Sequence, residues 1–227
     1  MKIPDFRINI INDNVIINNN EKEGKYIARK ERVWFPGATY HLMTRGIRRK
    51  EIFTDDLDRQ VYLELLKSSL RKYRCVLHAY CLMTNHIHML LETSDVEPGK
   101  LMKYLSGCYA VYFNGKYNHQ GHLFEGRYKS CLVKDDGYFL QTSRYIHLNP
   151  VKAGMAEHPV NYQWSSYRTM IGLADDGITE RKKTLAYFPV NSTIRYQEFV
   201  EDTGHKYVIQ EQEIRKIIGE DDLWLPW

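Results

Sequence analysis

The sequence predicts an α+β fold built on a split βαβ pattern. Two observations predict it. Short segments of apolar and β-branched residues lie between turn formers, as is typical of strands, and longer segments carry apolar residues at helical spacing. These segments follow the order strand, helix, strand, strand, helix, strand, with one extra helix after the last strand.

The first half of this pattern contains a strand, a helix and a second strand. Residues 38–44 predict a strand that Gly46 ends, and Asp55 or Asp56 offers an N-cap to the helix. The apolar residues of this helix recur at helical spacing: Leu63, Leu66, Leu70 and Tyr73. Residues 76–83 predict the second strand.

The middle of the pattern contains the third strand and the second helix. Thr84 and Asn85 form a tight turn into a strand at residues 86–92. Pro98 and Gly99 open an amphipathic helix, whose apolar stripe is Leu101, Leu105, Cys108 and Tyr112.

The pattern closes with a short strand at residues 128–133 and a final helix. Asp135 or Asp136 caps this helix, and Pro150 is expected to end it because proline lacks the amide hydrogen that a helix needs. The complete order is the ferredoxin-like arrangement, with an antiparallel sheet, an added helix and a helical C-terminal extension.

Three domains or segments are expected. Residues 1–28 form an Asn-rich leader that is either a small hairpin or disordered, and residues 29–170 form the globular domain. Residues 171–227 form an acidic extension with helical segments at 196–201 and 208–218.

Composition argues against several classes of protein. The 43% apolar content is ordinary for a soluble globular chain, and no apolar run reaches the roughly 18–20 residues that span a bilayer. The amino end does not read as a secretory signal. The four cysteines contain no Cys-x-x-Cys pair, which argues against a zinc knuckle and for reduced thiols in the cytoplasm.

The net charge of +4 is distributed unevenly along the chain. Basic residues gather between residues 29 and 50, whereas acids dominate residues 197–222. This asymmetry fits a polyanionic partner for the first half, but charge alone fits a solvated surface equally well.

The strongest chemical signal is the pair His86 and His88 in the third strand. Alternation along a strand points both side chains to one face, with Cβ atoms roughly 6–7 Å apart, so two imidazoles can converge on one cation. A histidine on a strand is more often a hydrogen-bonded core or surface residue, so the pair needs support from elsewhere in the sequence.

That support comes from the helix before Pro150. Tyr138, Thr142, Tyr145 and Asn149 share one helical face. Tyr145 and Asn149 lie one turn apart, so an amide oxygen that binds a metal can stand beside a phenol that attacks. Taken alone, a tyrosine on such a helix is usually a packing residue.

At this point the sequence resembles a known family. AYCLMTNHIH at residues 79–88 resembles the metal motif of the HUH endonucleases, where U is hydrophobic, and most of all that of the REP-associated and related single-tyrosine transposases of bacteria. Four other segments agree in order: residues 35–41, 121–128, 144–151 and 164–167. The resemblance covers residues 29–170, but Ile47 stands where the family usually has asparagine.

The resemblance implies roles for individual residues. His86, His88 and Asn149 match the metal ligands, and Tyr145 matches the nucleophile. The implied cofactor is a divalent metal ion, Mg²⁺ or Mn²⁺. The implied activity is a cut at hairpin-forming repeats in single-stranded DNA, which leaves a 5′-phosphotyrosine and a free 3′ hydroxyl and can be reversed to rejoin ends. The implied location is the bacterial cytoplasm, at the nucleoid.

Basic and aromatic residues are candidates for DNA contacts. The expected phosphate contacts are Arg45, Arg48, Arg49, Lys116, Arg127 and Lys129. Aromatic residues interleaved with them either stack on bases or belong to the core: Tyr109, Tyr112, Phe113, Tyr117 and Phe124.

Two other functions compete with the transposase. A replication initiator or relaxase-like nickase would share the chemistry, but the chain contains no Gly-Lys-Ser/Thr phosphate loop. A catalytically silent DNA-binding relative has no need of His86, His88, Tyr145 and Asn149 together. Whether the protein acts as a monomer or a homodimer stays open.

Overall fold

The computed structural model of the chain describes residues 9–11, 14–16 and 34–202. The chain divides into two units, Met1–Arg32 and Val33–Trp227, which we describe separately. In the first unit, β1 (Asn9–Ile11) and β2 (Asn14–Ile16) pair antiparallel. Of the two alternatives for the leader, its described residues therefore form the hairpin.

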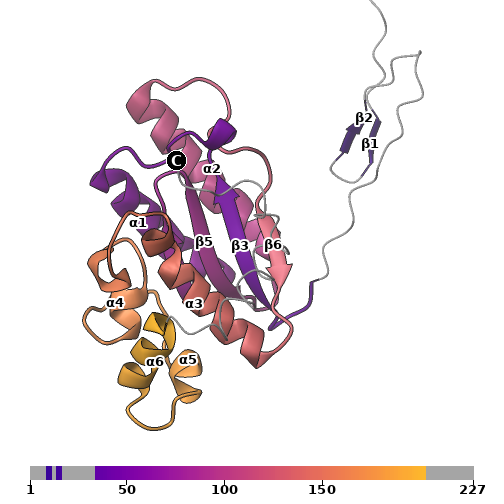
Figure 1. The fold of residues 1–227 in the computed structure, drawn as a ribbon. Coiled ribbons are helices and arrows are strands. Elements are labelled where there is room, and N and C mark those ends of the chain that lie inside the picture. The colour runs from indigo at the N-terminus through magenta and orange to yellow at the C-terminus, as the bar shows by residue number, and fades with distance from the viewer. Residues whose placement is uncertain (1–8, 12–13, 17–33, 203–227) are drawn as a thin grey trace, which may run out of the picture. The chain divides into compact units, whose positions relative to one another are not determined.

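The second unit is built around an antiparallel sheet of four strands (Figure 1). They are β3 (Thr39–Arg45), β4 (Val76–Leu82), β5 (His86–Glu92) and β6 (Lys129–Leu132), in the spatial order β4-β5-β3-β6. This order confirms the predicted ferredoxin-like arrangement, in which the first and third strands lie at the centre. The predicted bounds of β5 match at both ends, and those of the other strands differ by one residue at one or both ends.

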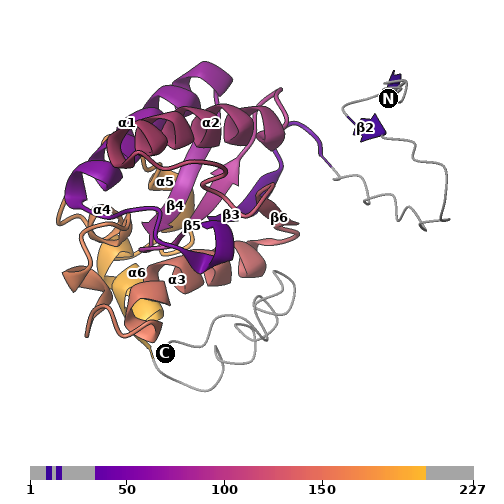
Figure 2. The same ribbon diagram turned by 90° about the horizontal axis from the view of Figure 1, so that it is seen from above.

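Two helices, α1 (Asp56–Tyr73) and α2 (Pro98–Tyr117), cover one face of the sheet (Figure 2). Asp55 caps α1 as expected, because its carboxylate accepts a hydrogen bond from the amide of Asp58 at 3.0 Å. The core between these helices and the sheet contains fully buried residues of each layer: Leu66, Leu105, Leu42, Ile87 and Met89.

A third helix, α3 (Asp136–Lys152), covers the opposite face of the sheet (Figure 2). Asp135 caps it by accepting from the amide of Tyr138 at 2.8 Å. The prediction that Pro150 ends the helix is wrong, since α3 continues to Lys152. Proline removes one helical hydrogen bond and crowds the carbonyl four residues earlier, but the backbone after it still bonds: the amide of Ala153 donates to the carbonyl oxygen of Asn149 at 3.0 Å.

The chain after α3 packs back onto that helix. It contains short helices, η2 (Pro159–Asn161), α4 (Tyr167–Met170), α5 (Lys182–Ala186) and α6 (Ser192–Glu201). The helix predicted at residues 196–201 is confirmed as the second half of α6, whereas residues 208–218 lie outside the described residues. Tyr167 and Tyr196 form a small core of their own with α3.

One buried histidine connects the helices of this second layer. His147 of α3 is bonded to the hydroxyl groups of Tyr196 and Ser166, each at 2.8 Å. Across the parts of the chain that the structure describes, no helix has the length and apolar character needed to cross a membrane.

Candidate active site

The predicted histidine pair lies on the sheet face that α3 covers. Strand alternation points His86, His88 and Leu90 to this face, where Leu90 packs with Tyr145 and Ile146. The two imidazole ring centroids are 4.9 Å apart, and the residues are 7% and 0% exposed. The strand thus brings the two rings close together, as its sequence predicts.

Asn85 fixes the tautomer of His86. Its amide nitrogen donates to the carbonyl oxygen of Arg49 at 3.1 Å, so its amide oxygen faces Nδ1 of His86, 2.6 Å away. Because an amide oxygen only accepts, Nδ1 of His86 carries the hydrogen and Nε2 carries the lone pair. Histidines that bind metals are commonly oriented in this way by a partner on the other ring nitrogen.

The Arg49 carbonyl is presented by a bent loop after β3. This loop, η1 (Ile47–Arg49), contains two consecutive non-glycine residues in the left-handed region, Arg48 with φ 52° and Arg49 with φ 59°. Gly46 precedes it, where a Cβ would overlap the carbonyl oxygen of Lys50. The loop conformation and the orientation of His86 are therefore linked through Asn85.

A third imidazole, which the sequence analysis missed, lies against His88. His41 of β3 is 1% exposed, and its Nε2 lies 3.0 Å from Nδ1 of His88. His41 ends the segment 35–41, one of the segments that resemble the family, and this was the signal available in the sequence. Its contact with His88 depends on the pairing of β3 with β5.

Tyr145 extends from α3 onto these rings. Its ring meets His41 and His88 edge to face, with centroid distances of 5.9 and 5.7 Å. The ammonium group of Lys152, two turns later, lies 5.2 Å from the centroid of the Tyr145 ring. The tyrosine is only 3% exposed.

Asn149 follows Tyr145 by one helical turn, as predicted. It is partly buried, and its amide nitrogen donates to the carbonyl oxygen of Tyr145 at 2.9 Å. This bond leaves the amide oxygen as an acceptor. Its role as a metal ligand stays a prediction.

All three imidazoles of the cluster are neutral near pH 7. Burial lowers the pKa of His41 to about 3, and burial with the nearby charge of Arg45 lowers the pKa of His86 to about 3. Burial and the neighbouring imidazoles hold the pKa of His88 well below its usual range. The neutral ring is the form that coordinates a metal ion.

The donor set fits a divalent ion of moderate softness. Two imidazole nitrogens with an amide oxygen suit Mn²⁺, and also Mg²⁺ where DNA oxygens complete the shell. Across the described residues, no group of three or more His, Cys, Asp and Glu side chains is placed to hold a metal ion. An ion held by His86 and His88 would therefore need further donors of another kind, such as amide oxygens.

Two of the predicted DNA contacts, Arg45 and Lys129, lie on strands beside the histidines. Arg45 ends β3 opposite His86, and its Nε donates to the Glu125 carboxylate at 2.6 Å. Lys129 pairs with Met43, which itself pairs with His88, so Lys129 lies on the same sheet face. Arg48, Arg127 and Lys129 are exposed.

Lys116 has a different environment. Its ammonium group is bonded to the carboxylates of Asp55 and Asp58, each within 2.8 Å, at the start of α1. The Asp58 side chain is fully buried, so Lys116 compensates a buried charge. We therefore leave Lys116 out of the proposed DNA contacts.

The aromatic residues of α2 belong largely to the core. Tyr109 is fully buried and donates to the carbonyl oxygen of Ile52 at 2.5 Å. Tyr112 and Tyr117 donate to the Asp58 carboxylate at 3.0 and 2.9 Å. Of the two alternatives for this stripe, packing is the one that the structure supports for these three residues.

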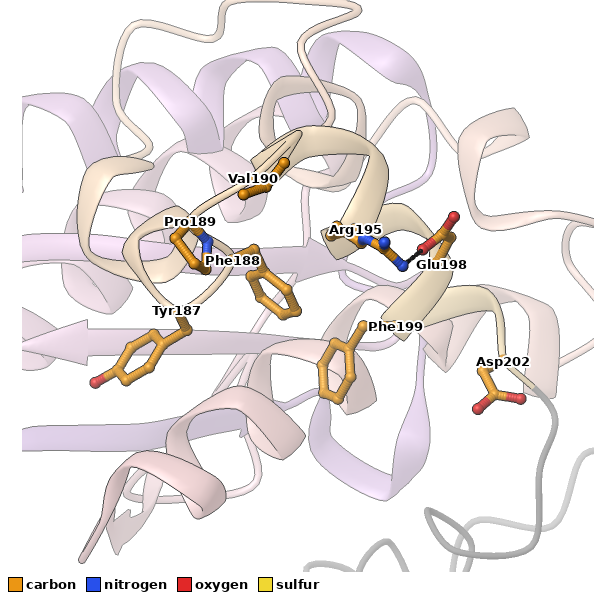
Figure 3. Close-up of a pocket in the computed structure, with 8 residues that line it drawn as sticks. All are labelled: Tyr187, Phe188, Pro189, Val190, Arg195, Glu198, Phe199 and Asp202. Carbon is orange, nitrogen blue, oxygen red and sulfur yellow. Dashed lines mark hydrogen bonds and ion pairs between the residues drawn. The ribbon is translucent and has the colours of Figure 1, made fainter.

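A pocket of about 550 Å³ lies elsewhere, between residues 187–190 and α6 (Figure 3). The rings of Phe188 and Phe199 line it, and Arg195 forms an ion pair with Glu198 at 3.1 Å on its rim. None of the histidines, nor Tyr145, lines this pocket.

Comparison with one solved structure agrees with the fold. A REP-associated tyrosine transposase bound to a REP hairpin is similar with a TM-score of 0.55 and 15% identity, over 68% of this chain and 98% of that one. A putative transposase from Deinococcus radiodurans R1 has a TM-score of 0.38 and 20% identity, over 48% of this chain and 89% of that one. No curated protein matches the chain in sequence.

The sequence also matches a family model. The model describes IS200-like transposases and matches residues 35–149, about half of the chain. The match begins before β3 and includes His86, His88, Tyr145 and Asn149. The chain therefore belongs to the IS200-like transposase family.

Proposed function

We propose that this transposase is a metal-dependent endonuclease and strand transferase that cuts single-stranded DNA at hairpin-forming repeats through a 5′-phosphotyrosine. The observation that carries the proposal is the contact of one tyrosine with two histidines of adjacent strands, Tyr145 with His41 and His88. The hairpin DNA in the similar transposase structure supports the choice of substrate.

In this proposal His86, His88 and Asn149 hold a Mg²⁺ or Mn²⁺ ion. The bound ion would draw charge from the scissile phosphate and orient it. Asn85 keeps the lone pair of His86 at Nε2, and burial keeps both imidazoles neutral. The ring nitrogens of His86 and His88 would therefore be in the neutral form that binds a metal ion before DNA binds.

Tyr145 would act as the nucleophile. Its phenol oxygen would form a bond to phosphorus while the bond from phosphorus to the 3′ oxygen breaks; the phenol proton passes to solvent, and the leaving 3′ oxygen takes up a proton from solvent to become a hydroxyl. One phosphodiester replaces another, so a 3′ hydroxyl can reverse the step and join ends. Since Tyr145 is 3% exposed, DNA binding must first uncover it.

The DNA backbone would run along the exposed cations around this face. We propose the exposed Arg48, Arg127 and Lys129 and the partly exposed Arg49 as phosphate contacts, with Arg45 bonded to Glu125 beside them. A single strand would suit this arrangement because a tyrosine on a helix reaches an unpaired backbone more easily than a base-paired one.

The test is formation of a covalent adduct. The protein is incubated with labelled hairpin DNA that carries a single-stranded flank, with Mn²⁺ or with EDTA, and then denatured. We expect an adduct with Mn²⁺ only, which is absent from Tyr145→Phe and retained by Tyr138→Phe, a matched tyrosine of the same helix. An adduct in Tyr145→Phe, or cleavage that EDTA leaves unchanged, would contradict the proposal.

A further inference from the structure

Two buried imidazoles of neighbouring strands share one hydrogen bond beside the candidate metal site. We propose that His41 is a positioning residue, which accepts the Nδ1 hydrogen of His88 and so keeps the Nε2 lone pair of His88 available for the metal ion. This inference rests on the proposed function of His88 as a ligand.

The sheet register holds the two rings together. β3 and β5 pair so that Met43 lies opposite His88 and His41 lies opposite Leu90, which makes His41 the diagonal neighbour of His88 on the same face. The ring centroids are 5.2 Å apart, and Nε2 of His41 lies 3.0 Å from Nδ1 of His88. The contact is thus built from two strands of the rigid core.

The hydrogen bond has two arrangements. In one, Nε2 of His41 donates, and the single hydrogen of the neutral His88 ring sits on Nε2. In the other, Nδ1 of His88 donates, and Nε2 of His88 carries the lone pair. Only the second arrangement allows a metal to bind at His88 Nε2.

The surroundings of His41 determine what it can contribute. The residue is 1% exposed, and within the described residues its Nδ1 is buried without a hydrogen-bond partner. No other partner therefore selects a tautomer of His41, and its ring can switch to accept from His88 when a cation binds. His86 differs, because the amide oxygen of Asn85 accepts the hydrogen of its Nδ1.

The experiment measures Mn²⁺ affinity of the full chain without DNA by calorimetry. His41→Phe removes the acceptor, so we expect binding to weaken by about 10- to 100-fold. His41→Gln supplies an amide oxygen and should recover most of the affinity. His147→Phe replaces another buried histidine, which is bonded to Tyr196 and Ser166, and should leave Mn²⁺ affinity unchanged.

A spectroscopic readout separates positioning from simple packing. Imidazole ¹⁵N shifts in the presence of diamagnetic Mg²⁺ should report a hydrogen on Nδ1 of His88 in the wild type and in His41→Gln. Equal Mn²⁺ affinity in His41→Phe and the wild type, or equal weakening in both His41 variants, would overturn the positioning role of His41. Either result would leave the proposed metal site untouched. A wild type that binds no Mn²⁺ would overturn the proposed metal site itself.

Discussion

Asn85 illustrates how a single amide connects a loop to a candidate ligand. It donates to the carbonyl of Arg49 and accepts from His86, so it joins the loop after β3 to the candidate metal ligand. Its sequence context indicates only a turn former, because the strand His86–Glu92 begins at the next residue. The structure adds a second role that spacing alone does not reveal.

Replacing Asn85 by alanine tests this connection. The Asn85→Ala variant loses the acceptor for Nδ1 of His86, so we expect Mn²⁺ affinity to fall by about 10- to 100-fold, as measured by calorimetry. Asn114→Ala is a matched control, since Asn114 also donates to a backbone carbonyl, that of Gly121 at 3.1 Å. If both variants bind Mn²⁺ like the wild type, Asn85 does not orient the ligand.

At the scale of elements, α1 and α2 are joined by a buried carboxylate. Asp58 accepts from the amides of Thr54 and Asp55 at 2.7 and 3.2 Å, and from Lys116 at 2.8 Å. The sequence predicts that Asp55 caps α1. It does not predict the ion pair between Asp58 and Lys116, because these two residues lie 58 positions apart.

Lys116 is paired with Asp58, so it differs from the cations that we propose as phosphate contacts. Lys116→Met leaves Asp58 without its cation, so we expect a lower melting temperature but an unchanged salt dependence of hairpin binding.

Arg127→Ala should show the opposite behaviour. Arg127 is exposed, so its loss should leave the melting temperature unchanged. The slope of log K against log salt should become shallower by about 0.7–0.9, the value for one phosphate contact. A change of slope in Lys116→Met, with none in Arg127→Ala, would contradict these assignments.

The fold is largely predictable from the sequence because its signals are local. Alternation marks β5 at both ends, and Asp55 and Asp135 cap their helices where expected. The prediction at Pro150 was wrong because a proline disturbs the turn before it, whereas the amides after it still find carbonyl partners in α3. The site is less predictable: His41 reaches His88 only through the register between β3 and β5, which is a non-local property.

At the scale of the whole molecule, buried neutral histidines make stability depend on pH. Burial lowers the pKa of His41, His86 and His147 to about 3, whereas the unfolded chain has histidine pKa values near 6.5. Between these values the unfolded state binds more protons than the folded state. The free energy of unfolding should therefore fall as the pH is lowered below about 6.5, by up to about 1.4 kcal/mol per pH unit for each histidine.

Urea denaturation of the metal-free protein at pH 7, 6, 5 and 4 measures this dependence. His147→Gln removes one of the three groups, so the decline should be shallower than in the wild type by about one histidine's share. Stability that stays constant from pH 7 to pH 4 would show that these histidines are not buried in the neutral form.

The most direct test of the account locates the bond to DNA. Trypsin cuts after Arg144 and Lys152, which releases a peptide, residues 145–152, that contains Tyr145 as its one tyrosine. After reaction with hairpin DNA and Mn²⁺, nuclease treatment and digestion, mass spectrometry should find a nucleotide linked through its 5′ phosphate to this peptide. A nucleotide on any other peptide, or a linkage through a 3′ phosphate, would contradict the account.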